Sequence, residues 1–505
     1  MNTSKEETRT KKAAKNTSVF LFNKLIMLIF AFVVRTVFIK ILGADYTGVN
    51  SLYSNVLSVL SLADLGMGSI CSFYLYKALA DNDEHQVYLI SIAFKKIYRI
   101  IMMVLTVIGL SLIPFLRYIV KSELDSKHLI IYYILFLANS IFSYAFTYRT
   151  QVLNADQKQY ILNISNTVVM TLLYVSQILF LIFTKNFYIY LVLQIVFTII
   201  NGLVANIIVC KYYPFLWNGK YSEKNYKIAG LEKNMSMTFL GKVSNVIMSQ
   251  TDSILISTIV NTITVGFYSN YYLLLNYLIN YFGVFVLGIT SSFGNLQTEN
   301  DKEKSYKLFN VLLVMFGMLG AFCSACFFCV IKDFIIVWIG KKYVMSDIFA
   351  LVLVVAFFVQ IIEQPINVYR DTLGIFKKGQ IARLVAAAVN IVLSIVLGCK
   401  YGLVGIIIAT PISKLLSYFW YDGIILMKYF NKNIGIYYIK LLWIFITTSV
   451  TVYISHYLCN KVNLSGIVAV IINFLICLIV FVFVEVPSFW NSELRTWIKE
   501  KIKLK

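Results

Sequence analysis

The sequence contains few charged residues: only 14% of its 505 residues are Asp, Glu, Lys or Arg, against about 25% in soluble globular proteins. So few charges cannot cover a water-facing surface, which excludes a soluble enzyme, a nucleic-acid-binding protein and a disordered chain. Apolar residues make up 59% of the chain, and the mean hydropathy is +0.77. These values are typical of a polytopic membrane protein.

Cysteine and histidine are also sparse, with 8 and 3 residues. Every cysteine lies in or at the end of an apolar stretch, without a loop partner at a metal or disulfide spacing. Cys323, Cys326 and Cys329 follow one another at helical spacing, but no histidine lies near them in the sequence, and we interpret them as small packing residues. We therefore expect no metal. The sequence also contains no recognisable set of catalytic residues and no Gly-rich nucleotide-binding loop. We therefore expect that the chain is not an enzyme and binds no cofactor.

A helix of about 20 apolar residues crosses a bilayer, and we predict fourteen such spans. They are residues 17–42, 48–76, 97–116, 129–149, 160–183, 187–210, 235–259, 265–292, 308–331, 346–369, 379–399, 403–427, 437–459 and 465–487. The predicted fold is therefore all-α. The longest connecting segment, 211–234, has 24 residues, which is too short to fold alone.

The basic residues predict the orientation. With the N-terminus in the cytoplasm, the segments on the cytoplasmic side hold 31 Lys and Arg and the outside loops hold 9, with 5 more inside the spans. Lys and Arg are enriched on the cytoplasmic side of membrane proteins. We therefore predict that both termini are cytoplasmic.

An internal repeat relates the first two spans to the seventh and eighth. At a fixed offset of 218, 10 of 46 ungapped positions are identical. The pairs include Asn16 with Asn234, Lys24 with Lys242, Gly48 with Gly266 and Tyr53 with Tyr271. Because six spans separate the copies, the copies run parallel, and transporters are often built from such repeats.

The repeat predicts two six-helix bundles followed by two C-terminal helices. The predicted organisation is a cytoplasmic N-terminal segment (1–16), an N-lobe of spans 1–6 (17–210), a cytoplasmic inter-lobe loop (211–234), a C-lobe of spans 7–12 (235–427), spans 13–14 (428–487) and a cytoplasmic basic tail (488–505).

Charged residues inside the spans are costly and usually mark function. Lys24 and Arg35 lie eleven residues apart in span 1, so they share one helical face. Lys242 and Asp252 belong to one polar face of span 7. In the repeat alignment this face overlays the face of Lys24 and Arg35. Arg35 is the deeper of the span 1 cations, and we predict that it lines a water-filled cavity. Lys24 and Lys242 either share this role or extend to the headgroups.

Span 10 carries the longest polar stripe, interrupted by Pro365, which predicts a kink. The stripe comprises Gln360, Glu363, Gln364, Asn367, Arg370 and Asp371. It either lines a wet cavity or joins neighbouring helices through hydrogen bonds. We predict substrate contacts for Gln360, Glu363, Asn367 and Arg370.

Several short sequences resemble the Wzx-type oligosaccharide flippases of the MOP superfamily. They are Leu42-Gly43-Ala44-Asp45-Tyr46-Thr47-Gly48, Asp64-Leu65-Gly66-Met67-Gly68, Tyr148-Arg149, Thr251-Asp252, Trp338-Ile339-Gly340, Tyr369-Arg370 and Gly402-Leu403-Val404-Gly405. Each is short and loose, but together and in order they extend over nearly the whole chain.

The resemblance implies that the chain moves a polyprenyl-pyrophosphate-linked oligosaccharide from the cytoplasmic to the outer leaflet of the bacterial cell membrane by alternating access. Implied partners are this lipid, the bilayer and, in the same pathway, a polymerase and export machinery; nucleic acid is not among them. Arginine suits pyrophosphate because its planar fork forms paired hydrogen bonds. Asp64, Asp252 and Glu363 are candidate ion or proton sites, and Asp252 is equally a candidate counter-ion for a nearby arginine.

Two other functions share the predicted fold: a multidrug or cation antiporter and a peptidoglycan-precursor flippase. Basic residues on the repeated faces favour an anionic substrate over a cationic drug. A membrane polymerase or glycosyltransferase is the alternative from another class. Such enzymes need a sizeable outside loop, whereas the longest here is about 15 residues, 332–346.

We predict that a cysteine introduced at Lys220 reacts with a thiol reagent only from the cytoplasmic side, because the segment 211–234 contains five lysines and must lie inside under the positive-inside rule. The measurement is labelling of intact cells with a membrane-impermeant maleimide. Labelling of residue 220 before the cells are opened contradicts the predicted topology.

Overall fold

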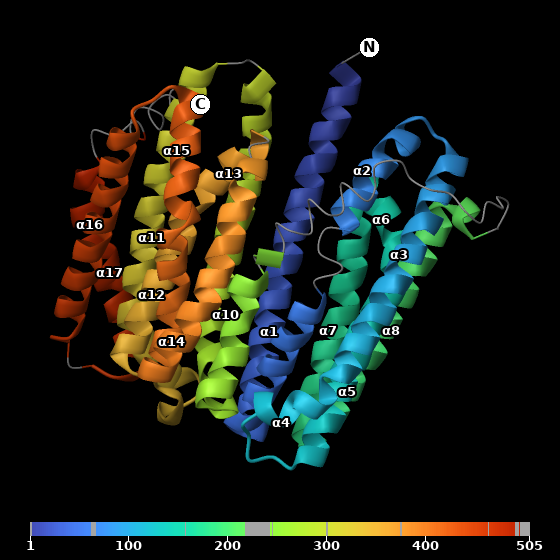
Figure 1. Cartoon of the computed structure of the whole chain (residues 1–505), viewed down its shortest axis with the longest axis horizontal. Helices are drawn as coiled ribbons and strands as arrows, with labels where there is room; N and C mark the ends of the chain where they lie inside the picture. Colours follow the sequence, from blue (N-terminus) through green and yellow to red (C-terminus); the bar gives the residue numbers. More distant parts are fainter. Residues whose placement is uncertain are drawn as a thin grey trace. The chain divides into compact units, whose positions relative to one another are not determined.

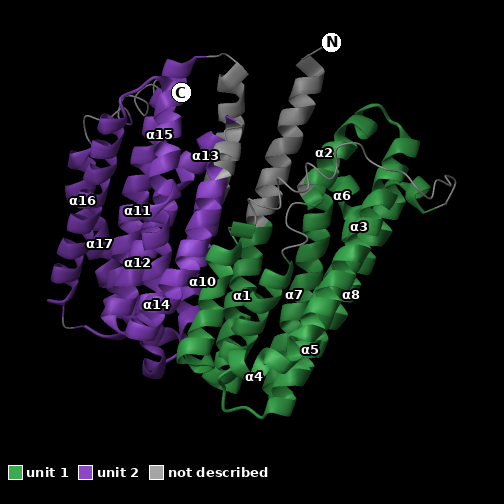
Figure 2. Cartoon of the chain, in the orientation of Figure 1, with its two compact units in different colours: residues 1–266 green, residues 267–505 purple. Residues whose placement is uncertain are grey.

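The computed structural model describes the backbone of residues 3–61, 67–156, 158–217, 243–244, 246–298, 301–373, 376–462, 464–489 and 494. Throughout these residues the regular structure is helical, without a strand. The chain divides into two compact units, Met1–Gly266 (unit 1) and Phe267–Lys505 (unit 2) (Figure 2). Each is described by itself.

Unit 1 contains α1 and the helices up to the start of α10 (Figure 1). Its elements are α1 (Thr3–Leu60), α2 (Met67–Ala80), α3 (Glu84–Ser111), the 3-10 helix η2 (Ile113–Phe115), α4 (Leu116–Ile119), α5 (Ser126–Ala145), α6 (Thr147–Ala155), α7 (Gln159–Thr184), α8 (Phe187–Tyr212), the 3-10 helix η3 (Pro214–Leu216) and the π-helix η4 (Ile256–Val260).

Helix α10 (Thr262–Thr298) starts in unit 1 and continues in unit 2. The remaining elements of unit 2 are α11 (Lys302–Trp338), the 3-10 helix η5 (Lys341–Tyr343), α12 (Asp347–Ile362), α13 (Gln364–Thr372), α14 (Phe376–Leu416), α15 (Tyr418–Phe430), α16 (Ile434–Cys459) and α17 (Gly466–Ser488).

The outer faces of these helices are apolar: Phe183 is 81% exposed and Phe483 is 75% exposed. Exposing such apolar surfaces to water is unfavourable, whereas contact with lipid carries no such cost. Ten helices among the described residues are long and apolar enough to cross a membrane, with shorter apolar helices at Ile70–Ala80 and Val246–Val260. The chain is therefore a multi-pass membrane protein, as its composition predicts.

Ten long helices accommodate more than ten predicted spans because some helices are joined through a kink. Helix α1 runs from predicted span 1 into span 2 across Gly43, where φ is 88°, a conformation that glycine adopts without strain. Helix α14 likewise joins predicted spans 11 and 12 across Gly402, where φ is 61°. Predicted span 2 (48–76) is covered by the part of α1 after Gly43 and by α2, with residues 62–66 outside the described part of the chain. The predicted boundaries of the inter-lobe loop stay predictions, because most of that loop lies outside the described residues.

The repeat is visible in a reciprocal contact between α1 and the start of α10. A Cβ atom on Gly48 would lie 2.0 Å from the carbonyl oxygen of Thr262, and one on Gly266 would lie 2.4 Å from that of Ala44. The offset of 218 aligns Ala44 with Thr262 and Gly48 with Gly266. Each copy thus presents its glycine to the partner position of the other, as expected of a two-fold contact.

The repeat also retains the role of a buried tyrosine. Tyr53 is fully buried and donates a hydrogen bond to the carbonyl of Leu129 at 3.0 Å. Its repeat partner Tyr271 is also buried and donates to the carbonyl of Tyr343 at 3.4 Å. Both acceptors lie near the start of the fourth span of their own half, so the two tyrosines attach equivalent helices.

We predict that Gly48→Ala lowers the stability of the protein by about 1–3 kcal/mol, because the backbone of Thr262 must move to admit a methyl group. Gly266→Ala is expected to behave alike. Gly283→Ala is the control, since a Cβ there meets nothing within 4 Å. The measurement is thermal unfolding in detergent. Equal losses in all three variants contradict the close approach as the cause.

Candidate functional site

A buried ion pair joins Glu363 and Lys414 in unit 2. Glu363 lies between the end of α12 and the start of α13, directly before Gln364 and Pro365. Lys414 lies in α14, one turn after Pro411. The Lys414 Nζ donates to Glu363 Oε2 at 2.9 Å, and the two side chains are only 12% and 6% exposed.

A second buried group surrounds Asp422 of α15. The guanidinium of Arg383, from α14, donates to Asp422 Oδ2, and that of Arg370, from α13, does so at 3.3 Å. Both arginines also donate to Asn367 Oδ1, at 3.3 Å and 3.1 Å. The Arg383 guanidinium lies over the ring of Tyr418 at 4.6 Å, and the Tyr418 side chain also lies beside Glu363 and Lys414.

Together Glu363, Arg370, Arg383, Lys414 and Asp422 form what we call the unit 2 ion cluster. With all groups ionised, three cations meet two carboxylates, so the cluster has a net charge of +1. Removing an ion from water costs several kcal/mol even after relaxation, and partners offset this only with good geometry. The surplus positive charge makes this cluster more compatible with an anionic ligand than with a cationic one.

Unit 1 has a different cationic site around α6. Arg149 is half-buried, donates to Asn206 Oδ1 of α8 at 3.2 Å, and lies over the ring of Trp217 at 4.7 Å. Lys95 lies over the ring of Tyr148 at 5.7 Å, and Arg149 lies over the same ring at 5.3 Å. Within the described part of the chain no carboxylate forms an ion pair with Arg149, so its partners there are neutral.

The sequence predictions for unit 1 concern Lys24, Arg35 and Asp252. Arg35 is half-buried on α1, and its charge acts on the nearby Tyr190 of α8. Lys24 is exposed on the same helix, and Asp252 is buried, with 8% of its surface accessible. Lys242 and Asp64 lie outside the described residues. Substrate contact by any of these residues stays a prediction.

Of the predicted span 10 residues, the structure brings Glu363, Asn367 and Arg370 into the ion cluster. Gln360 lies one turn earlier and is half-buried, and its carbonyl accepts a hydrogen bond from Gln364 at 3.3 Å. The side chain of Asp371 lies outside the described residues. Two residues of the stripe therefore form ion pairs with other helices: Glu363 with Lys414 of α14, and Arg370 with Asp422 of α15.

Sequence reasoning misses Arg383 and Asp422. The count of basic residues places Arg383 among the cations of the cytoplasmic side, whereas the structure buries it at 7% exposure. Asp422 stands in an apolar stretch, where a lone carboxylate is itself a signal for a buried partner. That signal is present in the sequence, but the identity of the partner is not.

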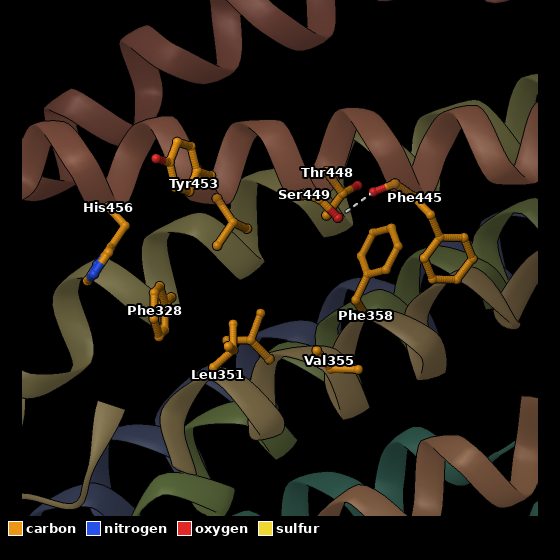
Figure 3. A pocket seen from close by; sticks show the side chains of 11 residues that line it. Phe328, Leu351, Val355, Phe358, Phe445, Thr448, Ser449, Tyr453 and His456 are labelled. Atoms are coloured by element: carbon orange, nitrogen blue, oxygen red, sulfur yellow. Dashed lines mark hydrogen bonds between the residues drawn. The ribbon is translucent and has the colours of Figure 1, made fainter. Parts of the chain in front are cut away.

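Unit 2 also contains an apolar cavity of about 440 Å³. Figure 3 shows that side chains of α11, α12 and α16 point into it. Phe358 and Leu351 lie on one side, and Phe445 and Tyr453 on another. Thr448, Ser449 and His456 are the polar residues among its lining. Its chemistry suits a hydrocarbon chain.

The fold and these clusters define a helical, multi-pass membrane protein that holds charged groups inside its spans. The sequence profile described as polysaccharide biosynthesis protein matches residues 13–288, more than half of the chain. The chain therefore belongs to the polysaccharide biosynthesis protein family. None of the curated proteins compared with the chain matches it.

Solved structures with the same fold cover most of the chain. The lipid II flippase MurJ in an inward closed conformation has a TM-score of 0.65 at 13% identity, over 95% of this chain and 99% of that one. An inward-facing multidrug resistance MATE family transporter of the MOP superfamily has a TM-score of 0.57 at 12% identity, over 82% and 98%. The Vibrio cholerae MATE transporter VcmN in the bent form has a TM-score of 0.51 at 15% identity, over 83% and 98%. At these identities the likeness establishes the fold.

We predict that Glu363→Leu and Lys414→Met each lower the free energy of unfolding by about 3–5 kcal/mol, because each leaves one buried charge without its partner. The double variant is expected to recover most of this loss, since it removes both charges. Folded yield and thermal unfolding in detergent measure the effect. Additive losses in the double variant contradict the ion pair.

Proposed function

We propose that the chain is a flippase of the Wzx type, which moves polyprenyl-pyrophosphate-linked oligosaccharide repeat units from the cytoplasmic to the outer leaflet of a bacterial cell membrane. The product would supply a surface or capsular polysaccharide. Membership of the polysaccharide biosynthesis family and the fold shared with a lipid II flippase support the proposal.

The observation that carries the proposal is the excess of cations over carboxylates in the unit 2 ion cluster and around Arg149, among the described residues. The unit 2 ion cluster has a net charge of +1, and Arg149 in unit 1 has neutral partners among the described residues. A pyrophosphate is an anion with several acceptor oxygens, and guanidinium groups bind such oxygens in pairs. Arg35, half-buried in α1, is a further cation within unit 1.

A multidrug antiporter shares this fold but needs carboxylates for cationic drugs. Here Glu363 and Asp422, both buried, are engaged by Lys414, Arg370 and Arg383, which argues against that function. A peptidoglycan precursor is also a polyprenyl-pyrophosphate lipid, so its flippase would need the same headgroup chemistry. That alternative is favoured by the fold likeness to MurJ.

A membrane polymerase or glycosyltransferase would need room for catalytic groups outside the membrane. The longest loop predicted to lie outside, 332–346, is largely occupied by the end of α11 and by η5, with Tyr343 buried. These features argue for transport rather than catalysis.

We predict that Arg35→Ala abolishes polysaccharide export at normal folded yield, and that Arg35→Lys restores it only in part, because a lysine lacks the paired donors of arginine. Arg117→Ala is the matched control, since Arg117 is exposed and stacks on the neighbouring Tyr118. The measurements are export, folded yield and the leaflet in which the lipid-linked repeat unit accumulates, all in the same cells.

Accumulation on the cytoplasmic side supports a flippase, and accumulation on the outer side indicates a polymerase. Full export from a stable Arg35→Ala protein removes Arg35 from the substrate path. Loss of folded protein, restored by a charge reversal at both Arg35 and Asp252, assigns Arg35 to a structural pair. Rescue of a strain lacking its lipid II flippase assigns the chain to the peptidoglycan precursor.

A further inference from the structure

Four cysteines from three helices meet inside unit 2. Helix α11 contributes Cys326 and Cys329, α16 ends at Cys459, and α17 contributes Cys477. The sulfur atoms of Cys329, Cys459 and Cys477 all lie within 4.8 Å of one another, and all three residues are buried. Cys326 lies beside Cys477 as a fourth sulfur. Cys477 therefore lies at the centre of a sulfur cluster that joins the three helices.

Polar groups surround these sulfurs although the neighbourhood is apolar. The Cys459 thiol donates to the backbone carbonyl of Asn473 at 3.8 Å, and the Asn473 side chain donates to Asp333 Oδ2 at 3.3 Å. The side-chain oxygen of Asn473 is buried and accepts no hydrogen bond within the described part of the chain. The hydroxyl of Ser455 lies beside Cys477. Plain apolar packing does not account for this set of polar atoms, whereas metal ligands are commonly held by such neighbours.

Sulfur donors determine which ions the cluster would select. Thiolates prefer soft or borderline ions such as Zn²⁺ and Cu⁺, whereas Mg²⁺ and Ca²⁺ require oxygen ligands. A Zn–S bond of about 2.3 Å places tetrahedral thiolates ~3.8 Å apart. The sulfurs of Cys329, Cys459 and Cys477 already lie within 4.8 Å of one another. Small side-chain movements would therefore bring them to the spacing that a bound ion requires. Each thiol that coordinates the ion would release its proton to solvent.

We propose that Cys329, Cys459 and Cys477, with Cys326 as the fourth sulfur, bind one thiophilic d¹⁰ metal ion, Zn²⁺ or Cu⁺. The ion would join α16 and α17 to α11. These two helices are the C-terminal pair that follows the repeat, and the metal would fix them to a helix of the second half. The site is structural and takes no part in the proposed recognition of the lipid headgroup.

The test uses the full chain, purified in detergent without a polyhistidine tag or chelator. Elemental analysis is expected to find a stoichiometric ion, and its identity decides between zinc and copper. After chelation, titration with Cd²⁺ is expected to produce a thiolate-to-metal charge-transfer band, to protect the four cysteines from alkylation and to raise the thermal unfolding temperature.

Cys477→Ser is expected to weaken Cd²⁺ binding by more than about tenfold. Cys71→Ser is the matched control, because Cys71 is also fully buried but lies in the core of unit 1. If Cys477→Ser fails to fold, Cys459→Ser and the alkylation pattern of the wild-type protein decide the question.

Three results overturn the proposal. The first is a wild-type protein without a bound ion and without a charge-transfer band on adding Cd²⁺. The second is a band of equal strength in Cys477→Ser. The third is recovery of these cysteines as a disulfide when cells are lysed in alkylating reagent. Polysaccharide export is measured in parallel, so the loss of the metal and the loss of transport are scored separately.

Discussion

The cost of placing a charge in a low-dielectric interior is the constraint on which the structure of unit 2 depends. Five ionised side chains lie there with little exposure, and each is held by a partner of opposite charge from another helix. Replacing such a group by hydrophobic residues is often neutral or stabilising in proteins. Stability alone therefore does not explain why the chain keeps them, whereas a ligand or a conformational change that uses the charges does.

The ion cluster lies where helices are interrupted. Glu363 separates α12 from α13, and Lys414 lies three residues before Ser417, at which α14 gives way to α15. Interrupted helices leave backbone groups unsatisfied, and in membranes such groups are tolerated only inside protein or beside water. The interrupted helix ends and the ion cluster thus require the same surroundings, either inside the protein or beside water. Transporters commonly place their binding sites at such discontinuous helices.

Hydropathy predicts most of the helices because an apolar run of the right length has few alternatives in a bilayer. It also places span boundaries at Gly43 and Gly402, where the backbone leaves the helical conformation. Helical periodicity correctly places Glu363, Asn367 and Arg370 on one face. It cannot identify the partners Lys414 and Asp422, because a helical face does not specify which helix will pack against it.

The cysteine cluster shows the same limit more strongly. Cys326 and Cys329 are close in sequence, but Cys459 and Cys477 belong to two later helices. No spacing rule connects residues so far apart, and only the packing of α16 and α17 on α11 brings their sulfurs together. Patterns within one helix were therefore predictable from the sequence, and sites assembled from several helices were not.

The two halves of the chain show how a repeated framework acquires different electrostatics. Both have a Tyr-Arg pair on the short helix after the fourth span, Tyr148-Arg149 on α6 and Tyr369-Arg370 on α13. Each arginine donates to a residue of the sixth span of its own half, Asn206 in unit 1 and Asp422 in unit 2. Asparagine and aspartate have nearly the same shape and differ by one charge. The framework is thus retained, while the arginine pairs with a carboxylate in unit 2 and with a neutral amide in unit 1.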